Sequence, residues 1–537
     1  MELIFFNLRK SFVFVLLILV IFFLSLFGYL YPGMNYAIFW LLVAAVFLLT
    51  WIKTEYGVYA VLVELFIGSK GYLFSFSLQG FVVPLRLALF LIVISVFLFK
   101  AVRGKKLEFF QSNLWPSFLI LAAFLAYGLI NGIIHHDLKV VFYDVNAYLY
   151  FALIFPIFHV LRRRESIFVF FKILSVSALS VALITFIILA DFSLFQYSPG
   201  LVDATRIQDE QLKKMGSLSD QPENARLAQT TRITAEKLKL NWQELSPEKN
   251  YLYRWLQDTG QGQVSYLGGR LFRVFMTSHF YLVVYLIILL SFLLTRQGFK
   301  IKKNLFSLAM ALILILSMII SFSRSFWLGF AAAFIFLLTG LPFRRIIKLA
   351  AFLVSLALVV MCVLYFVWPD IFGVFTNRFT SLFRPTTELA ASNRMSLVNP
   401  ILEKVKAKPI FGSGFGTEVT YKSLVAGTDL VEYVKVYVYE WGYLDIMVKI
   451  GILGLITYLF FIAMIIKNYF VDIKNFDERL KFLIRGLMSG LIFLLIVHFT
   501  TPYLNHPLGL GFLMICAAIF YYKKEILTYE FAEKSHH

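Results

Sequence analysis

Apolar segments of about 20 residues recur along the whole chain, and this repeated length constrains the fold more than any other feature. About 20 helical residues cross the roughly 30 Å apolar core of a bilayer, because each residue advances an α-helix by about 1.5 Å. Such segments lie at 11–31, 36–52, 57–79, 81–99, 114–134, 140–161, 167–190, 271–295, 303–322, 325–341, 345–368, 443–466, 480–500 and 507–522. We therefore predict an all-α, polytopic integral membrane protein with about 12–14 transmembrane helices.

The segment 57–79 is the weakest of these candidates. It contains Glu64, Gly68, Lys70 and Gly71, which interrupt its apolar character. A broken or re-entrant helix is therefore an alternative to a full span there. The first segment, 11–31, is too long for the apolar part of a signal peptide and lacks a small-residue cleavage site, so we expect it to remain as a span.

The composition supports a membrane protein and argues against a nucleic-acid-binding one. Hydrophobic residues make up 60% of the 537 residues and charged residues only 15%, whereas about 25% of a soluble domain is charged. The net charge of +19 is carried by short basic clusters between apolar segments, which is typical of cytoplasmic loops. We therefore interpret the basic residues as determinants of membrane orientation, and expect membrane lipids rather than nucleic acid as partners.

The basic clusters also predict the topology. They precede the first span or follow alternate spans, and include Arg9, Lys10, Lys53, Lys100, Arg103, Lys105, Lys106, Arg162, Arg163, Arg164, Arg296, Lys300, Lys302, Lys303, Arg344, Arg345, Lys348, Lys467, Lys474, Lys523 and Lys524. With about fourteen spans, all of these clusters and both termini lie in the cytoplasm. The same arrangement places two long polar segments, 191–269 and 369–442, on the extracytoplasmic side.

This topology divides the chain into five regions. They are an N-terminal group of about seven transmembrane helices (1–190), a partly helical extracytoplasmic loop (191–269), spans 8–11 (270–368), an extracytoplasmic catalytic loop (369–442), and the last three spans with a cytoplasmic tail (443–537). Within the first loop, residues 222–257 are rich in Leu, Gln and Glu, so they form either an amphipathic helix over the spans or a flexible surface loop.

Arginines at the outer ends of spans need an explanation, because the positive-inside rule disfavours them there. Arg270 and Arg273 open the eighth span, and Arg324 lies at the turn between the ninth and tenth. They either extend to lipid phosphates or bind an anionic ligand, since a guanidinium group matches two diphosphate oxygens at once. Arg324 also begins a helix, where backbone N–H groups favour an anion.

The second polar segment supplies the remaining candidates. Arg394 follows Asn393, and Gly412, Gly414 and Gly416 form a glycine-rich stretch that either admits a glycan or phosphate against the backbone or simply makes a turn. Glu440 lies among aromatic residues just before a span, as a general base or as a solvated carboxylate. His506, in the last outer connection, is a further substrate-binding candidate.

The sequence predicts neither a metal nor a cofactor. It contains no Asp-x-Asp pair, no nucleotide-binding glycine motif and no zinc-type spacing of His and Cys. Cys362 and Cys516 lie inside apolar segments, which argues against a structural disulfide. An ATP-driven or nucleotide-sugar enzyme is therefore unsupported.

Four sequence patches between about 265 and 470 resemble the O-antigen ligase and O-antigen polymerase superfamily of bacterial envelope glycosyltransferases. They are Arg273 at the start of a span after a long loop, the stretch from Ser323 to Gly329, Asn393-Arg394 with Pro409 to Gly416, and Glu440 to Leu444 followed by Gly451-Ile452-Leu453-Gly454. The second and third are fairly specific in combination. The ligases of this family are expected to have a His where this chain has Glu440, which leaves polymerase-like relatives open.

The resemblance implies a GT-C-like, metal-independent, inverting glycosyltransferase in the cytoplasmic membrane. Such an enzyme takes a glycan from an undecaprenyl-diphosphate carrier and joins it to a glycan or lipid-glycan acceptor at the outer face. Arg273 and Arg324 would stabilise the leaving diphosphate, Glu440 would deprotonate the acceptor hydroxyl, and Arg394 would position a substrate.

Two other classes remain open. A transporter or lipid-linked glycan flippase would have charges lining a path through the bilayer, and the charges deep in spans are few: Glu64, Lys70, Arg86, Asp144 and Lys449. A structural or assembly protein would use the outer loops for partners and would not need the arginines.

Overall fold

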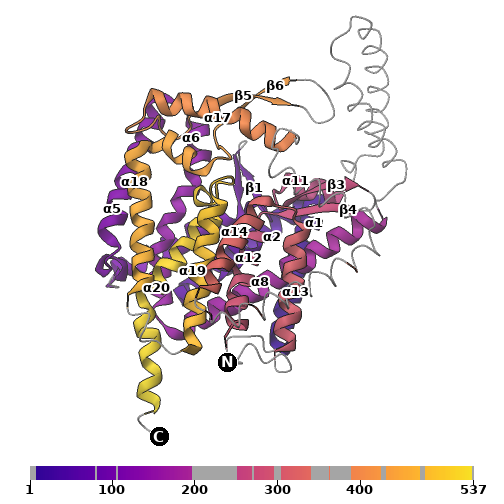
Figure 1. Cartoon of the computed structure of the whole chain (residues 1–537), viewed down its shortest axis with the longest axis vertical. Helices are drawn as coiled ribbons and strands as arrows, with labels where there is room; N and C mark the ends of the chain where they lie inside the picture. Colours follow the sequence, from indigo (N-terminus) through magenta and orange to yellow (C-terminus); the bar gives the residue numbers. More distant parts are fainter. Residues whose placement is uncertain are drawn as a thin grey trace, which may run out of the picture.

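A computed structural model of the chain describes residues 8–78, 81–104, 107–195, 251–268, 271–295, 304–339, 341, 347, 362, 389–424, 431–471 and 478–534. Most of these residues lie in long helices that run side by side, as Figure 1 shows. Among the described residues, seven helical segments are long and apolar enough to cross a membrane, and four shorter apolar helices accompany them. The protein is therefore an all-α, multi-pass membrane protein, with only minor sheets.

The helices follow the predicted apolar segments closely. They are α1 (Leu8–Leu30), α2 (Pro32–Ile52), α3 (Thr54–Ile67), α4 (Leu85–Val102), α5 (Trp115–His135), α6 (Leu138–Val145), α7 (Ile154–Leu161), α8 (Arg164–Ala190), α11 (Tyr251–Asp258), α12 (His279–Leu293), α13 (Leu305–Ile320), α14 (Arg324–Leu338), α17 (Leu389–Ala407), α18 (Gly442–Phe470), α19 (Glu478–Val497) and α20 (Pro507–Lys534). Short helices η1 (Glu108–Gln111), η2 (Asn146–Leu153), η3 (Asp191–Phe195) and η8 (Tyr503–Asn505) connect some of them. The predicted span 345–368 lies almost wholly outside the described residues.

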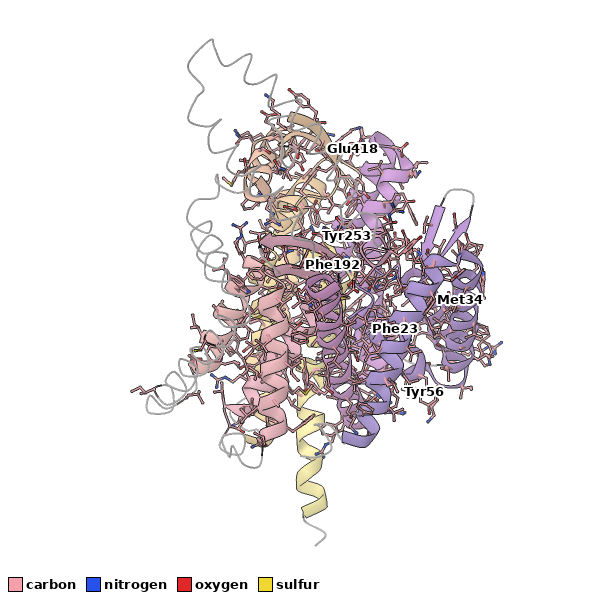
Figure 2. The ribbon with its side chains drawn as sticks, turned by 90° about the vertical axis from the view of Figure 1, so that its right-hand side faces the viewer. Phe23, Met34, Tyr56, Phe192, Tyr253 and Glu418 are labelled. Atoms are coloured by element: carbon pink, nitrogen blue, oxygen red, sulfur yellow. The ribbon has the colours of Figure 1, made fainter. Side chains whose placement is uncertain are left out.

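Three antiparallel hairpins accompany the helices. They are β1 (Ser75–Leu78) with β2 (Phe81–Pro84), β3 (Gly262–Gly268) with β4 (Leu271–Met276), and β5 (Val419–Leu424) with β6 (Val431–Val436). All three lie at one end of the helices together with α17 (Figure 1), and we call this the hairpin end. Figure 2, turned by 90°, places Glu418 beside β5 at this end and Tyr56 toward the other.

The hairpins correct two predicted boundaries. The span predicted over 57–79 is a helix only to Ile67, because the chain turns at Gly68–Gly71, where Ser69 and Gly71 adopt positive φ, and then enters β1. The span predicted from residue 271 begins as a helix at His279, since 271–276 form β4 and pair with β3. Local hydropathy does not distinguish a buried strand from a helix over so few residues.

The opposite end carries basic side chains that hold the helix ends together, and we call it the basic end. Lys100 Nζ donates to the carbonyl of Thr50 at 2.8 Å, and Arg163 Nη1 lies 3.0 Å from Glu55 Oε1. Arg162 Nη1 lies 3.0 Å from Glu108 Oε1. Because α4 begins directly after β2 and ends beside Lys100, the basic end lies one helix length away from the hairpin end.

Helix α12 forms the centre of the bundle. All residues from Ser278 to Leu289 are buried, and α12 packs against α8, α13, α14 and α19. Helix α2 instead leaves most of its side chains exposed, and α1 leaves many, including Phe12, Leu41 and Ile52. An apolar surface of this kind fits contact with lipid. Of the predicted amphipathic helix 222–257, only residues 251–257 are described, and they are helical in α11.

Helix α18 is interrupted at Gly451, and the segment 409–414 fills the interruption. Gly451 has φ 71°, so the helical backbone bonds cannot continue through it. Instead Ile452 N donates to Pro409 O at 2.9 Å, while Ser413 N donates to Val448 O at 2.6 Å and Gly414 N to Lys449 O at 3.0 Å. Irregular backbone inside a membrane bundle is stable only when its polar groups are paired in this way.

Because the backbones are in such close contact, adding a single methyl group at one of these glycines is expected to lower the stability of the protein strongly. Gly414 has φ 91°, and a Cβ there would lie 2.6 Å from Gly132 N. We expect Gly414→Ala to destabilise the protein by about 1–3 kcal/mol or more, from backbone strain and overlap together. Thermal unfolding in detergent measures this. Gly33→Ala in α2 is the control, since a Cβ added at Gly33 would meet no atom within 4 Å, and equal melting temperatures for both variants would contradict the prediction.

Candidate active site

Arg273 and the turn before Arg324 meet at the hairpin end. Arg273 lies on β4 opposite Ser265 of β3, and its Nε donates to Ser321 O at 2.8 Å. Its guanidinium carbon lies 5.2 Å from the centre of the Phe275 ring. Ser321 is three residues before Arg324, so two arginines far apart in sequence belong to one local structure.

Arg324 is the first residue of α14. Ser323 precedes it in an extended conformation, which ends the turn and starts the helix. The amides of Phe326 and Trp327 both donate to Ser323 O at 3.1 Å. The first amides and the dipole of a helix N-terminus favour an anion, so Arg324 adds a full positive charge where the backbone already contributes a partial one.

Glu440 and Arg394 form an ion pair at the same end of the protein. Arg394 Nε on α17 donates to Glu440 Oε2, just before α18. Trp441 Nε1 donates to Arg394 O at 3.0 Å and so holds the two segments together. The Glu440 side chain is 53% exposed, which leaves its carboxylate accessible to a substrate hydroxyl.

The connection between α19 and α20 links these groups. Thr501 Oγ1 lies 3.4 Å from Ser325 Oγ on α14, and Tyr503 OH donates to Thr277 O at 3.1 Å, next to β4. Asn505 Nδ2 donates to Gly442 O at 3.3 Å, two residues after Glu440. The segments carrying Arg273, Arg324 and Glu440 therefore all contact one connection, 498–506. Only His506 in this connection was predicted from the sequence to belong to the site.

His506 is half-buried in that connection and neutral near pH 7. Burial lowers the pKa of its imidazole well below the usual range, and the positive charges of Arg86 and Lys70 lower this pKa further. Its Nδ1 accepts the amide of Leu508 at 3.3 Å, so the proton of the neutral ring lies on Nε2. A neutral imidazole can donate one hydrogen bond to a substrate oxygen.

The three glycines of the 409–416 stretch all have positive φ: 77° at Gly412, 91° at Gly414 and 79° at Gly416. Each approaches a neighbouring backbone or side chain so closely that a Cβ would lie 2.5–2.7 Å from it. The packing of this stretch against α5, α6 and α18 explains why glycine is required. Contact of the glycines with a substrate stays a prediction, and Arg270 lies outside the described residues.

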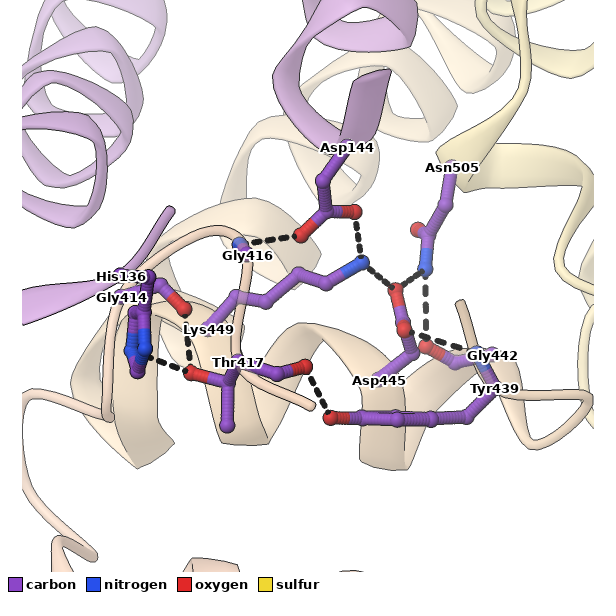
Figure 3. Close-up of polar contacts among 10 residues, drawn as sticks. All are labelled: His136, Asp144, Gly414, Gly416, Thr417, Tyr439, Gly442, Asp445, Lys449 and Asn505. Carbon is purple, nitrogen blue, oxygen red and sulfur yellow. Dashed lines mark hydrogen bonds and ion pairs between the residues drawn. The ribbon is translucent and has the colours of Figure 1, made fainter. Parts of the chain in front are cut away.

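A buried charge network lies next to the site and was not predicted as part of it. The Lys449 ammonium of α18 lies between two carboxylates, 2.5 Å from Asp144 Oδ1 of α6 and 2.8 Å from Asp445 Oδ2 of α18, as Figure 3 shows. All three side chains are at most 1% exposed. Charge deep in a span was the available signal, but the sequence did not show that Asp144 and Lys449 are partners.

A second buried pair lies elsewhere in the bundle. Arg86 of α4 bonds Glu64 of α3 through two hydrogen bonds, 2.7 Å at Nε and 3.1 Å at Nη2, and donates to Ser69 O at 2.7 Å. This pair holds the turn that ends α3. Glu64, Arg86, Asp144 and Lys449 thus all take part in ion pairs between helices.

Comparison with known proteins agrees with the resemblance drawn from the motifs. The family model described as O-antigen ligase matches residues 309–459, which include Arg324, Arg394, the 412–416 glycines and Glu440. No curated protein and no solved structure matches the chain. Residues 309–459 are therefore similar to the O-antigen ligase family, which supports the superfamily that the motifs indicated.

Proposed function

We propose that this protein transfers or polymerises glycan from an undecaprenyl-diphosphate-linked donor onto a sugar acceptor at the outer face of the cytoplasmic membrane. The match of residues 309–459 to the O-antigen ligase family model supports glycan transfer of this type in general. The observation that supports the more specific proposal is a shared contact with the connection 498–506. Thr277 directly after β4, Ser325 next to Arg324, and Gly442 two residues after Glu440 all bond to it.

The reaction breaks the bond between the donor sugar C1 and the diphosphate oxygen. Negative charge then grows on the leaving diphosphate, and Arg273, Arg324 and the N-terminus of α14 supply positive charge to stabilise it. The proposed transfer is metal-independent, because these groups take the place that a cation has in other diphosphate chemistry. The donor is already activated, so no ATP is consumed.

The acceptor hydroxyl attacks C1 from the side opposite the leaving group, which inverts the configuration there. Glu440 takes the proton of this hydroxyl as the new glycosidic bond forms. A carboxylate serves this purpose as the family's histidine would, because both accept a proton through a lone pair. Arg394 orients the Glu440 carboxylate through their ion pair and would contact either substrate.

Charge asymmetry supports the outer-face location. The basic end gathers Lys100, Arg162 and Arg163, as cytoplasmic ends of membrane proteins do. The proposed site lies at the opposite, hairpin end. Lipid diphosphate would then reach the site laterally from the outer leaflet.

The alternative, a transporter or lipid-linked glycan flippase, has less support. A translocation path needs charges that face it, whereas Glu64 is paired with Arg86, and Asp144 and Asp445 with Lys449. A purified enzyme distinguishes the two: transfer releases lipid diphosphate and forms a glycosidic bond, and flipping changes neither.

Glu440→Gln tests the proposed function. We expect it to slow transfer from a lipid-diphosphate glycan by about 10²–10⁴-fold, because glutamine cannot accept the acceptor proton. Product formation by the purified protein in lipid measures the rate. Glu418→Gln is the control, since Glu418 is a carboxylate at the same end that pairs with Lys435 at 2.5 Å. A Glu440→Gln rate close to that of the unmodified protein would refute the role of Glu440 as the base.

A further inference from the structure

In the network around Lys449, the carboxylates of Asp144 and Asp445 each accept hydrogen bonds from several donors. Asp144 Oδ2 accepts the amide of Gly416 at 2.8 Å. Asp445 Oδ1 accepts the amide of Tyr439 at 3.1 Å, and Asp445 Oδ2 accepts Asn505 Nδ2 at 2.5 Å as well as Lys449 Nζ. Two carboxylates and one ammonium carry a net negative charge, and these amide donors offset the surplus.

A buried network of this kind is costly, so its placement calls for a reason beyond stability. The free energy needed to remove two charges from water is often as large as the attraction between them. Replacing a buried ion pair by apolar residues therefore often leaves the protein equally stable. In some proteins buried ionic groups select one geometry rather than add free energy, because each hydrogen bond fixes a direction as well as a distance. In this protein, the network would select one conformation of the backbone segments to which it is hydrogen-bonded.

The network holds the residues on both sides of Glu440. Asp445 binds the amide of Tyr439, and Tyr439 OH donates to Thr417 O at 2.6 Å. Asn505 Nδ2 bridges Asp445 and the carbonyl of Gly442. Figure 3 shows these contacts at Tyr439 and Gly442, which precede and follow Glu440 in the sequence. Tyr439 is fully buried while Glu440 is exposed, so a fixed backbone presents an accessible carboxylate.

The network also fixes Glu440 in relation to the arginines. Asn505 belongs to the connection 498–506, whose Thr501 contacts Ser325 beside Arg324. Through Asp144, the network extends to α6 and to the 409–417 stretch. The position of Glu440 is therefore set by the same connection that contacts the start of α14.

We propose that Asp445, Lys449, Asp144 and Asn505 are positioning residues for the proposed base Glu440, holding the 439–442 backbone so that its carboxylate faces the acceptor hydroxyl beside Arg324. This inference rests on the proposed function. A displacement of about 1 Å in a reacting group can cost about 10²-fold in rate, so a positioning network has a measurable kinetic effect.

A double-mutant cycle between the network and Glu440 tests the proposal. In Asp445→Asn, one of two accepting oxygens becomes an amide nitrogen, so either the Tyr439 amide at Oδ1 or the Lys449 and Asn505 donors at Oδ2 lose their acceptor, and the backbone is expected to shift. We expect this variant to lower kcat by at least about tenfold in the unmodified protein, and by less than about twofold in the Glu440→Gln background, where no base remains to be displaced. Radiolabelled donor and long incubation make the residual rate measurable.

Asn505→Ala keeps the proposal testable if Asp445→Asn fails to fold. It removes the bonds to Asp445 and Gly442 but leaves the three charges paired, so we expect normal amounts of protein in the membrane. We expect kcat to fall less than in Asp445→Asn, and to stay nearly unchanged when Asn505→Ala is added to Glu440→Gln. The matched control is Glu64→Gln, which alters a second buried ion pair, that of Glu64 with Arg86, away from 439–442. Its kcat per folded molecule should be unchanged.

Each outcome of the cycle has a definite meaning. If Asp445→Asn and Asn505→Ala lower kcat equally with Glu440 and with Gln at that position, the network does not act through Glu440 and the proposal is overturned. Unchanged kcat in both folded variants overturns it as well. If instead Glu440→Gln alone is fully active, Glu440 is not the general base. That result contradicts the proposed function, and it is distinct from a failure of the positioning proposal.

Discussion

Glycan transfer is expected to slow by about 10²–10³-fold when Arg324 is replaced by alanine, with normal amounts of protein in the membrane. The reason is that charge develops on the leaving diphosphate in the transition state, and Arg324 lies at the α14 N-terminus where that charge would be stabilised. The loss should appear in kcat more than in the donor KM, since the interaction strengthens as the bond breaks. Steady-state kinetics with purified protein in lipid measure both.

Two further variants make this result interpretable. Arg324→Lys keeps one positive charge but loses the two-point geometry of the guanidinium group, so its rate should fall between those of the unmodified protein and Arg324→Ala. Arg162→Ala at the basic end is the control, and it should leave the rate unchanged. An Arg324→Ala enzyme that retains most of its activity would remove Arg324 from the proposed mechanism.

Lys449→Met should destabilise the protein more than any other single substitution in the buried network. It leaves Asp144 and Asp445 in the interior without their shared cation, and breaking a buried pair in this way costs about 3–5 kcal/mol. A lower melting temperature in detergent and a lower amount in membranes are the expected observations. Lys422→Met on β5 is the control, because this lysine is exposed and its ammonium lies 6.0 Å from the centre of the Tyr433 ring, outside the buried network.

The triple variant Lys449→Met, Asp144→Asn, Asp445→Asn separates charge from packing. Without any buried charge it should recover most of the lost stability, since neutral polar groups cost less to bury than unpaired carboxylates. It should nevertheless remain slow in glycan transfer, because the 439–442 backbone is no longer held by the same bonds. If Lys449→Met alone were as stable as the unmodified protein, the expected loss of about 3–5 kcal/mol on breaking the buried pair would be wrong.

Much of the fold could be predicted from the sequence because lipid imposes a simple local rule. A span must be apolar over about 20 residues, and α1, α2, α5, α8 and α18 coincide with the apolar segments to within a few residues. The rule failed after α3 and at β4, where apolar residues instead form strands that pair with neighbouring backbone. Hydropathy reports the environment of a residue, not its hydrogen-bond partner.

The candidate site residues were selected from the sequence, but their contacts with one another were not predicted. Arg273, Arg324, Arg394 and Glu440 were selected by motif and by their place at span ends, and all of them lie at the hairpin end. The pairing of Arg394 with Glu440 and the contacts of the connection 498–506 were not predicted. These contacts join residues 46 to 226 positions apart, and no local pattern carries information about them.

By itself, then, the sequence determined that this chain crosses the membrane many times and that its basic residues cluster at alternate connections. It also contained the patches that resemble the O-antigen ligase family. Only the tertiary structure decided that Lys449 lies between Asp144, 305 residues away, and Asp445, and that the glycines of 409–416 fill the interruption of α18. The physical reason is that span length and charge asymmetry are local properties of the chain in lipid. The partners of buried charges and backbone groups depend on which helices pack together.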